Sequence, residues 1–504
     1  MDSLALGHRR LERRWVNLLA ARWRKPGRSF GASFPRRAEA KAAYRLVQNP
    51  RASLRFESLL APHHLQTQRR MAAEAVVVLA QDTTTLSYNT LEQTRGLGPV
   101  GESAKPGRGL LLHSLHAFRP DRIPLGCAWA QLWARPPESD TAQRDEQSVA
   151  DKESGRWLEA YQAAARLARS MPRSHLVVCA DREADLFELY DQSEVAPANL
   201  HLLVRAKHDR GLENGRTLWK ELSRQPVGGT LQVEVPRRQG RPARQATLEL
   251  KWTPIQIAPP RVALKKSWSP LGLYVVMARE VAPPPGVEPI EWVLLTDWKV
   301  DSLKMARRLV RWYGLRWGIE CWHQVLKDAC GVEDRQLKSA SALERALVLD
   351  MIVAWRAMLL CRLAKQTPTL SASPYYTAEE LKVLEVYRPQ LPAWASLPAA
   401  PKNEPGRGAG GSTATTSAPA HAAGGASAPT PPEPATPVSS LTLLQANLLV
   451  AMLAGFWGRK GDGTPGPKTL SQGLLILSEL VRYSQMSAAS PHRPPHKPPS
   501  RKPG

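Results

Sequence analysis

Four side chains that could hold a phosphate or a metal ion occur at helical spacing between residues 303 and 327. They are a phenol, a guanidinium, a carboxylate and an ammonium: Tyr313, Arg316, Glu320 and Lys327. The stretch has no proline, and at about 100° per residue the four lie on one face of a continuous helix, opposite an apolar face. A carboxylate among cations can bind a metal while its neighbours bind phosphates. Considered alone, the stretch favours a simpler interpretation, a solvated face with an Arg316–Glu320 ion pair.

Two further carboxylates follow short apolar segments that are typical of buried strands. An apolar segment that begins at Ala75 leads to Asp82, and the apolar segment 176–179 leads to Asp181. Such residues stand at the functional edge of an α/β sheet, although either one alone is more often a turn or capping residue. Together with Glu320 they form a set of three carboxylates, which is stable only when protons or cations balance the repulsion.

The absence of a His/Cys set beside these carboxylates points to a hard cation. Oxygen ligands and a polyanionic partner favour Mg²⁺. Two Mg²⁺ ions can activate water or a 3′-OH on one side of a phosphodiester and stabilise the leaving oxygen on the other. The set therefore predicts nuclease or strand-transfer chemistry.

The charge of the chain indicates its partner. Its 504 residues include 69 Lys+Arg and 45 Asp+Glu, a net charge of +24, which favours a nucleic acid. Residues 1–70 hold 16 Lys/Arg and 4 Asp/Glu and show the periodicity of short helices. We expect this basic helical module to contact DNA, with an inert basic hairpin as the alternative.

Other compositional features exclude several classes of protein. The five cysteines have no paired spacing, which argues against a zinc site or a disulfide framework. No apolar run approaches the roughly 20 residues that span a bilayer, and no signal peptide is evident. We therefore expect a soluble, cytoplasmic protein without a membrane partner.

The patterns predict an α/β protein of several units. Residues 199–297 read as strands alone, and residues 398–437 lack every large hydrophobic residue, which is typical of a disordered linker. Two apolar helices near the C-terminus are too small to be stable alone and must pack on the body or on a second copy. The predicted divisions are N-terminal helices (1–70), an α/β unit (71–370) with a β-rich insertion (about 199–297), a linker (371–440, mostly disordered from 398), C-terminal helices (441–484) and a disordered basic tail (485–504).

The spacing Tyr313-x2-Arg316-x3-Glu320-x6-Lys327 matches the YREK signature, and the chain resembles the insertion-sequence-four family of bacterial cut-and-paste DDE transposases. A lone signature would be weak evidence, but ordered blocks extend the likeness along most of the chain. They are AQDTTTLSY, DKESGRW, CADREAD, VRAKH, EWVLLT, YGLRWGIE and GFWGRKG. The resemblance implies an RNase H-like catalytic core with a β-rich insertion, an N-terminal helical DNA-binding domain and C-terminal helices that form a dimer.

The resemblance also implies roles for individual residues. Asp82, Asp181 and Glu320 would be catalytic and hold two Mg²⁺ ions, or Mn²⁺ in their place. The implied contacts to the transposon end are phosphate contacts from Tyr313, Arg316 and Lys327, base stacking by Trp292 and Trp317, and a block near the DNA at Arg205, Lys207 and His208. Without the resemblance, Trp292 would be interpreted as a core residue at a strand end.

The implied activity is excision of a DNA element through a hairpin intermediate and its insertion into target DNA by a synaptic homodimer. The partners would be the inverted-repeat ends and the target duplex. Two alternatives remain open, a catalytically silent DNA-binding regulator or inhibitor of transposition, and a metal-dependent nuclease. Two positions depart from the family, since Gln324 stands where close relatives carry Lys and Asn89 stands where Arg is expected.

Overall fold

The computed structural model describes residues 4–101, 107–136, 154–235, 243–260, 268–395, 440–459 and 461–489. The chain divides into two compact units, Met1–Arg362 and Leu363–Gly504, and each is described by itself. Among the described residues, no helix has the length and apolar character needed to cross a membrane.

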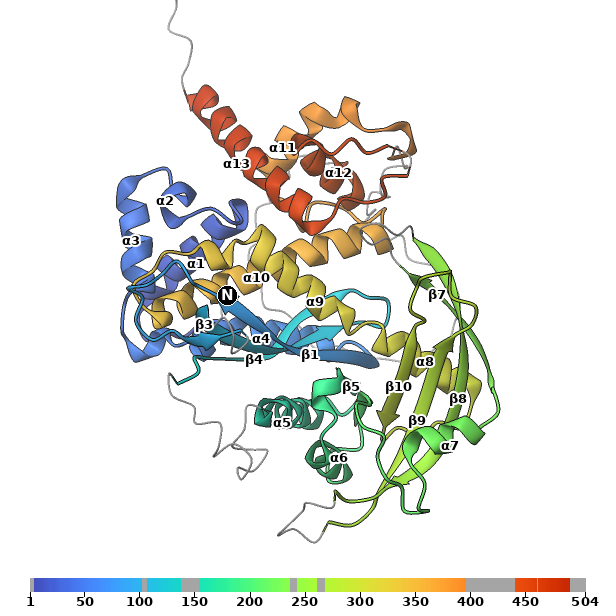
Figure 1. The fold of residues 1–504 in the computed structure, drawn as a ribbon. Helices are drawn as coiled ribbons and strands as arrows, with labels where there is room; N and C mark the ends of the chain where they lie inside the picture. Colours follow the sequence, from blue (N-terminus) through green and yellow to red (C-terminus); the bar gives the residue numbers. More distant parts are fainter. Residues whose placement is uncertain are drawn as a thin grey trace, which may run out of the picture. The chain divides into compact units, whose positions relative to one another are not determined.

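The first unit is built on one large mixed sheet (Figure 1). Its described strands are β1 (Val76–Ser87), β2 (Gly98–Val100), β3 (Gly107–Phe118), β4 (Pro124–Trp133), β5 (His175–Ala180), β6 (Leu200–Arg205), β7 (Gly229–Val235), β8 (Arg244–Ile257), β9 (Leu271–Glu280) and β10 (Glu291–Thr296). The order is β2-β3-β1-β5-β6-β10-β9-β8-β7, and β4 pairs with β3. Strands β1, β5 and β6 are parallel, whereas β3, β4 and β10 pair antiparallel with their neighbours. The predicted α/β class is confirmed.

Helices cover both faces of this sheet. Those of the first unit are α1 (Arg9–Arg24), α2 (Phe30–Ser33), α3 (Arg37–Val47), α4 (Phe56–Met71), α5 (Gly155–Ser170), α6 (Phe187–Glu194), α7 (Leu218–Arg224), α8 (Leu303–Tyr313), α9 (Trp317–Gln324) and α10 (Ala340–Gln366). Successive side chains of β1 point to opposite faces of the sheet, so their packing partners show which helices cover each face. Val77 and Leu79 pack in the cluster that contains α5 and α6, whereas Ala80 and Leu86 pack in the cluster that contains α9 and α10.

The N-terminal helices share a core with α10. Leu11, Trp15 and Leu18 of α1 belong to the same buried cluster as Leu347 and Met351 of α10. The periodicity of short helices predicted for residues 1–70 therefore corresponds in α1 to a buried apolar face.

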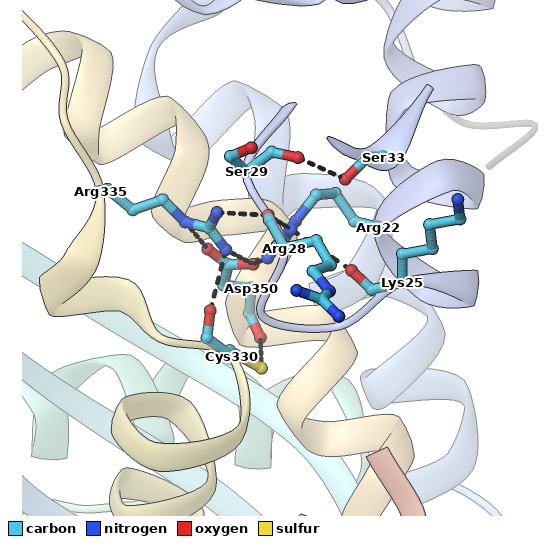
Figure 2. A network of polar contacts seen from close by, with 8 residues as sticks. All are labelled: Arg22, Lys25, Arg28, Ser29, Ser33, Cys330, Arg335 and Asp350. Atoms are coloured by element: carbon cyan, nitrogen blue, oxygen red, sulfur yellow. Dashed lines mark hydrogen bonds and ion pairs between the residues drawn. The ribbon is translucent and has the colours of Figure 1, made fainter. Parts of the chain in front are cut away.

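A buried ionic network joins α1 to α10 (Figure 2). Arg22 and Arg335 both donate to the carboxylate of Asp350, at 3.1 Å from each Nε. Arg335 also donates to the carbonyls of Arg28 and Cys330. Arg22 and Asp350 are almost fully buried, so removing one partner would leave an uncompensated charge, which is strongly destabilising.

The stretch 199–297 differs from the prediction of strands alone. Helix α7 lies within it, because Leu218 and Leu222, one helical turn apart, are both buried. Its first strand, β6, pairs in parallel with β5, and β7 to β10 extend the same sheet rather than forming a separate one.

The helix predicted over 303–327 is not continuous. It divides into α8, a tight turn, α9 and a π-helical turn, Val325–Ala329. Leu315 and Arg316 donate to carbonyls three residues earlier rather than four. The cause is packing, since Leu315 is buried in the cluster around α8 whereas Ile319 is buried in the cluster around α10. One straight helix cannot follow both surfaces.

The second unit contains α11 (Ala378–Tyr387), α12 (Leu443–Leu453) and α13 (Pro467–Ala489), which pack on one another. The two predicted C-terminal helices are present. Two corrections apply: α11 lies in residues predicted as the start of a linker, and α13 extends five residues into the predicted disordered tail. A buried hydrogen bond of 2.7 Å from Tyr376, two residues before α11, to Asn447 joins the start of α11 to α12. The linker from 398 and the tail from 490 lie outside the described residues.

Candidate active site

Asp82 lies in the middle of β1 rather than at its end, which corrects the prediction. Three threonines follow it, and β-branched residues favour the strand that continues to Ser87. β3 pairs along this whole length, with Asp82 opposite Ser114, whereas the pairing of β1 with β5 ends at Ala80 and Cys179. Asp82 is therefore at the end of the parallel pairing although not at the end of its strand.

Asp181 follows β5 directly. Since Ala80 pairs with Cys179, the same register places Asp82 beside Asp181. The Asp181 carboxylate accepts a hydrogen bond from the Glu183 N–H at 2.9 Å and caps the short helical turn Arg182–Ala184. Two neighbouring parallel strands thus deliver two carboxylates to one edge, as the sequence predicted.

Glu320 on α9 joins this pair through Arg316. One guanidinium nitrogen lies 3.4 Å from Asp82, and the other pairs with Glu320 one helical turn away. The Arg316–Glu320 pair predicted from the spacing is present, and it includes Asp82 as well.

The electrostatics of the site show an incompletely balanced carboxylate cluster. Burial is the main cause that raises the pKa of Asp82, Arg316 lowers it, and Asp181 and Glu320 also raise it; the resulting pKa is about 7. Burial lowers the pKa of Arg316, but the acidic groups around it, Tyr313 and Glu320 foremost, raise it above its ordinary value.

The donor set fits a hard cation such as Mg²⁺, because it consists of carboxylate oxygens whose repulsion only protons or cations can relieve. Within the described part of the chain, no three acidic, His or Cys side chains are already arranged to hold a metal. Arg316 instead supplies the positive charge between Asp82 and Glu320.

Tyr313 is buried, which corrects its prediction on an open polar face. Its ring packs edge-on against Trp292, with centroids 5.2 Å apart. Burial raises the pKa of Tyr313 to about 12, while the nearby cations Arg316 and Arg205 lower it. Trp292 is half-buried in β10, and Arg205 donates to the Glu291 carbonyl at 2.9 Å. Tyr313 and Arg205 also lie near Asp181, whose charge acts to raise the pKa of both groups.

Three other predicted DNA contacts are more exposed. The Trp317 side chain is 48% exposed at the start of α9. Lys207 and His208 are exposed, and their backbone N–H groups donate to the buried carboxylate of Asp185 at 2.7 and 3.0 Å. Asp185 thus fixes the loop that carries both residues.

Lys327 lies in the π-helical turn, and its ammonium is 3.7 Å from Glu333. Glu333 also accepts from the Ser87 N–H at 2.7 Å, at the end of β1.

The two departures from the family have local partners, since Gln324 donates to Asp328 at 3.5 Å and Asn89 accepts from the Arg108 N–H at 2.8 Å.

Sequence reasoning missed a network behind Asp82. Arg156 of α5 donates to the Thr83 hydroxyl at 2.9 Å and lies 3.5 Å from the Glu183 carboxylate. Thr83 is also 2.8 Å from His113 Nδ1, and His113 Nε2 is 3.4 Å from Gln81. The block DKESGRW includes Arg156, but nothing in the sequence connects it to the residue after Asp82.

Comparison with known proteins supports a transposase and DNA as its partner. Residues 1–52 match the family described as transposase DNA-binding, within the basic module that the charge predicted to contact DNA.

Among solved structures, the chain matches a cryo-EM structure of a piggyBac transposase synaptic complex with hairpin DNA. The match has a TM-score of 0.30 and 10% sequence identity, and it covers 58% of this chain and 48% of that chain. This chain therefore spans about half the length of that transposase, and a TM-score of 0.30 does not indicate a shared fold.

Proposed function

We propose that this protein is a cut-and-paste DNA transposase of the DDE type and of the insertion-sequence-four family. The observation that carries the proposal is the convergence of Asp82, Asp181 and Glu320 around Arg316 in one site. The transposase DNA-binding match at residues 1–52 supports it independently. The order β4-β3-β1-β5-β6, antiparallel and then parallel, supports an RNase H-like core.

Asp82, Asp181 and Glu320 would hold two Mg²⁺ ions, or Mn²⁺. Bound there, the ions would supply Lewis-acid activation of a water or 3′-OH and stabilise the leaving oxygen. The carboxylates would position the ions at the phosphodiester. Arg316 would move from the carboxylates to a phosphate of the DNA end. Arg205, Tyr313 and Lys327 would hold neighbouring phosphates.

The proposed reaction opens the 3′ strand at the element end, forms a hairpin on the opposite strand, reopens it and joins the 3′-OH to target DNA. Trp292 packs on Tyr313 in the DNA-free protein and would leave that contact to stack on an extruded base. Exposed Trp317 would provide a second stacking surface. A homodimer would bring two ends together.

The test is incubation of the protein with Mg²⁺ and duplexes that carry the inverted repeats flanking its gene. We expect a 3′ nick and then a hairpin from the wild type, and neither from Glu320→Ala, which should bind the duplex normally. If the wild type forms no product while both proteins bind equally, the silent regulator is the correct function. Cleavage of unrelated duplexes at an equal rate would indicate a general nuclease.

A further inference from the structure

We propose that Arg156 is a positioning residue for the two aspartates, a role that rests on the proposed metal-dependent function. It lies on α5, which covers the face of the sheet opposite to α9, so its side chain approaches the two aspartates from the α5 face. Its side chain is only 14% exposed. It bonds to Thr83, the residue after Asp82 on β1, and approaches Glu183, two positions after Asp181 in the turn that follows β5.

The contact on the Asp82 side continues as a chain of hydrogen bonds. Arg156 Nε donates to Thr83 Oγ1, which leaves the threonine proton free to be donated to His113 Nδ1. His113 is buried, and burial together with Arg156 lowers the pKa of its imidazole well below the ordinary value. A neutral His113 accepts at Nδ1 and donates from Nε2 toward Gln81 Oε1.

This chain fixes both neighbours of Asp82. Side chains alternate along a strand, so Gln81 and Thr83 point to the α5 face while Asp82 points to the α9 face, where Glu320 lies. Holding Gln81 and Thr83 in place therefore fixes the position and direction of the Asp82 carboxylate.

The contact on the Asp181 side is the ion pair with Glu183. The Glu183 N–H donates to the Asp181 carboxylate at 2.9 Å, so a shift of Glu183 would shift that carboxylate too. A single planar guanidinium, with donors on both Nε and Nη2, thus links β1 to the helical turn that follows β5. Lysine, a point charge, could satisfy one side but not both.

The test is Mn²⁺ binding by the full-length protein, with free Mn²⁺ measured by electron paramagnetic resonance. Arg156→Gln and Thr83→Val should each weaken Mn²⁺ binding by about 10- to 100-fold, as loss of an outer partner of a ligand does. Arg156→Lys should fall between wild type and Arg156→Gln. Arg166→Gln, at an exposed position of the same helix, is the matched control and should bind like wild type.

Thermal unfolding of each variant accompanies the titration, and Thr83→Val preserves the volume of the side chain so that packing is retained. Unchanged Mn²⁺ affinity in Arg156→Gln or Thr83→Val overturns the inference alone. If Asp82→Asn binds Mn²⁺ as tightly as the wild type does, the metal site of the proposed function is overturned as well. Loss of end-DNA binding by Arg156→Gln with normal Mn²⁺ affinity shows that Arg156 contacts DNA instead, and overturns the positioning role.

Discussion

At the scale of single residues, Arg316 occupies the place where the proposed cations are needed. Its guanidinium bonds to Asp82 and pairs with Glu320, two of the three proposed ligands. In the DNA-free protein this arginine would therefore compete with the proposed metal, and a DNA phosphate would compete for the arginine.

Replacing this arginine should open the site to metal. We expect Arg316→Gln to bind Mn²⁺ about tenfold more tightly or better without DNA, because each charge-assisted hydrogen bond of the competing pair is worth about 1.5–3 kcal/mol. Isothermal titration of the DNA-free protein measures this, with exposed Arg311→Gln as the control. Equal or weaker binding by Arg316→Gln would show that Arg316 does not guard the site.

The raised pKa of Asp82 gives a pH dependence of stability. Burial raises its pKa from 3.8 to about 7, so between these values the folded protein holds a proton that the unfolded chain has lost. Stability therefore falls as pH rises through this window. In EDTA, we expect Asp82→Asn to be more stable than wild type at pH 8 and equal to it near pH 4.

The gain at pH 8 has an upper bound of about 4 kcal/mol at about 1.4 kcal/mol per pKa unit, and it is reduced because Arg316 loses a partner. Chemical denaturation at the two pH values measures it, with exposed Asp301→Asn as a control that should give no such gain. A gain of Asp82→Asn that is larger at pH 4 than at pH 8 would contradict the sign.

At the scale of elements, the sequence predicted which segments carry the site but not how each one runs. Short apolar segments were sufficient to locate β1 and β5, and the spacing of the apolar residues located the helical stretch that forms α8 and α9. The end of β1 was not predictable, because the pairing of Thr83 to Ser87 with β3 is a long-range contact. The break after Tyr313 depends on two separate hydrophobic clusters, which no local pattern reveals.

The start of α9 is held close to β3 by a glycine. A β-carbon on Gly318 would lie 2.7 Å from the ring of Phe118, so in Gly318→Ala either this buried ring or α9, with Glu320 on it, must shift. We expect a loss of about 1–3 kcal/mol in the free energy of unfolding and a loss of strand cleavage. Gly211→Ala, which has open space around it, is the control for both measurements. Normal cleavage by Gly318→Ala would mean that the site tolerates displacement of α9.

At the scale of the whole molecule, the N-terminal DNA-binding region is part of the core of the first unit. The composition predicted the basic character of this region, but it could not reveal that its apolar faces pack on α10. The partners of Arg22, which lies more than 300 residues before Asp350, were likewise hidden from any local reading.

Removal of residues 1–70 should therefore also destabilise the rest of the first unit. We expect the truncated protein to expose the face of α10 that contains Leu347 and Met351, and consequently to bind a hydrophobic dye and aggregate. Size-exclusion chromatography and dye fluorescence measure this against the full-length protein. A soluble, monodisperse truncation with a cooperative thermal transition would show that the remaining sheet is stable by itself.

In the proposed transposase, the bonds of Arg22 and Arg335 to Asp350 would make the first unit act as a ruler along DNA. If the helix that reads the element end cannot turn relative to the sheet that cuts it, the number of base pairs between the recognised sequence and the cut is a property of the protein. Lengthening the DNA between them by one base pair would leave that number unchanged, and the cut would fall one position inside the old boundary. The network shown in Figure 2 would thus define where the mobile element ends.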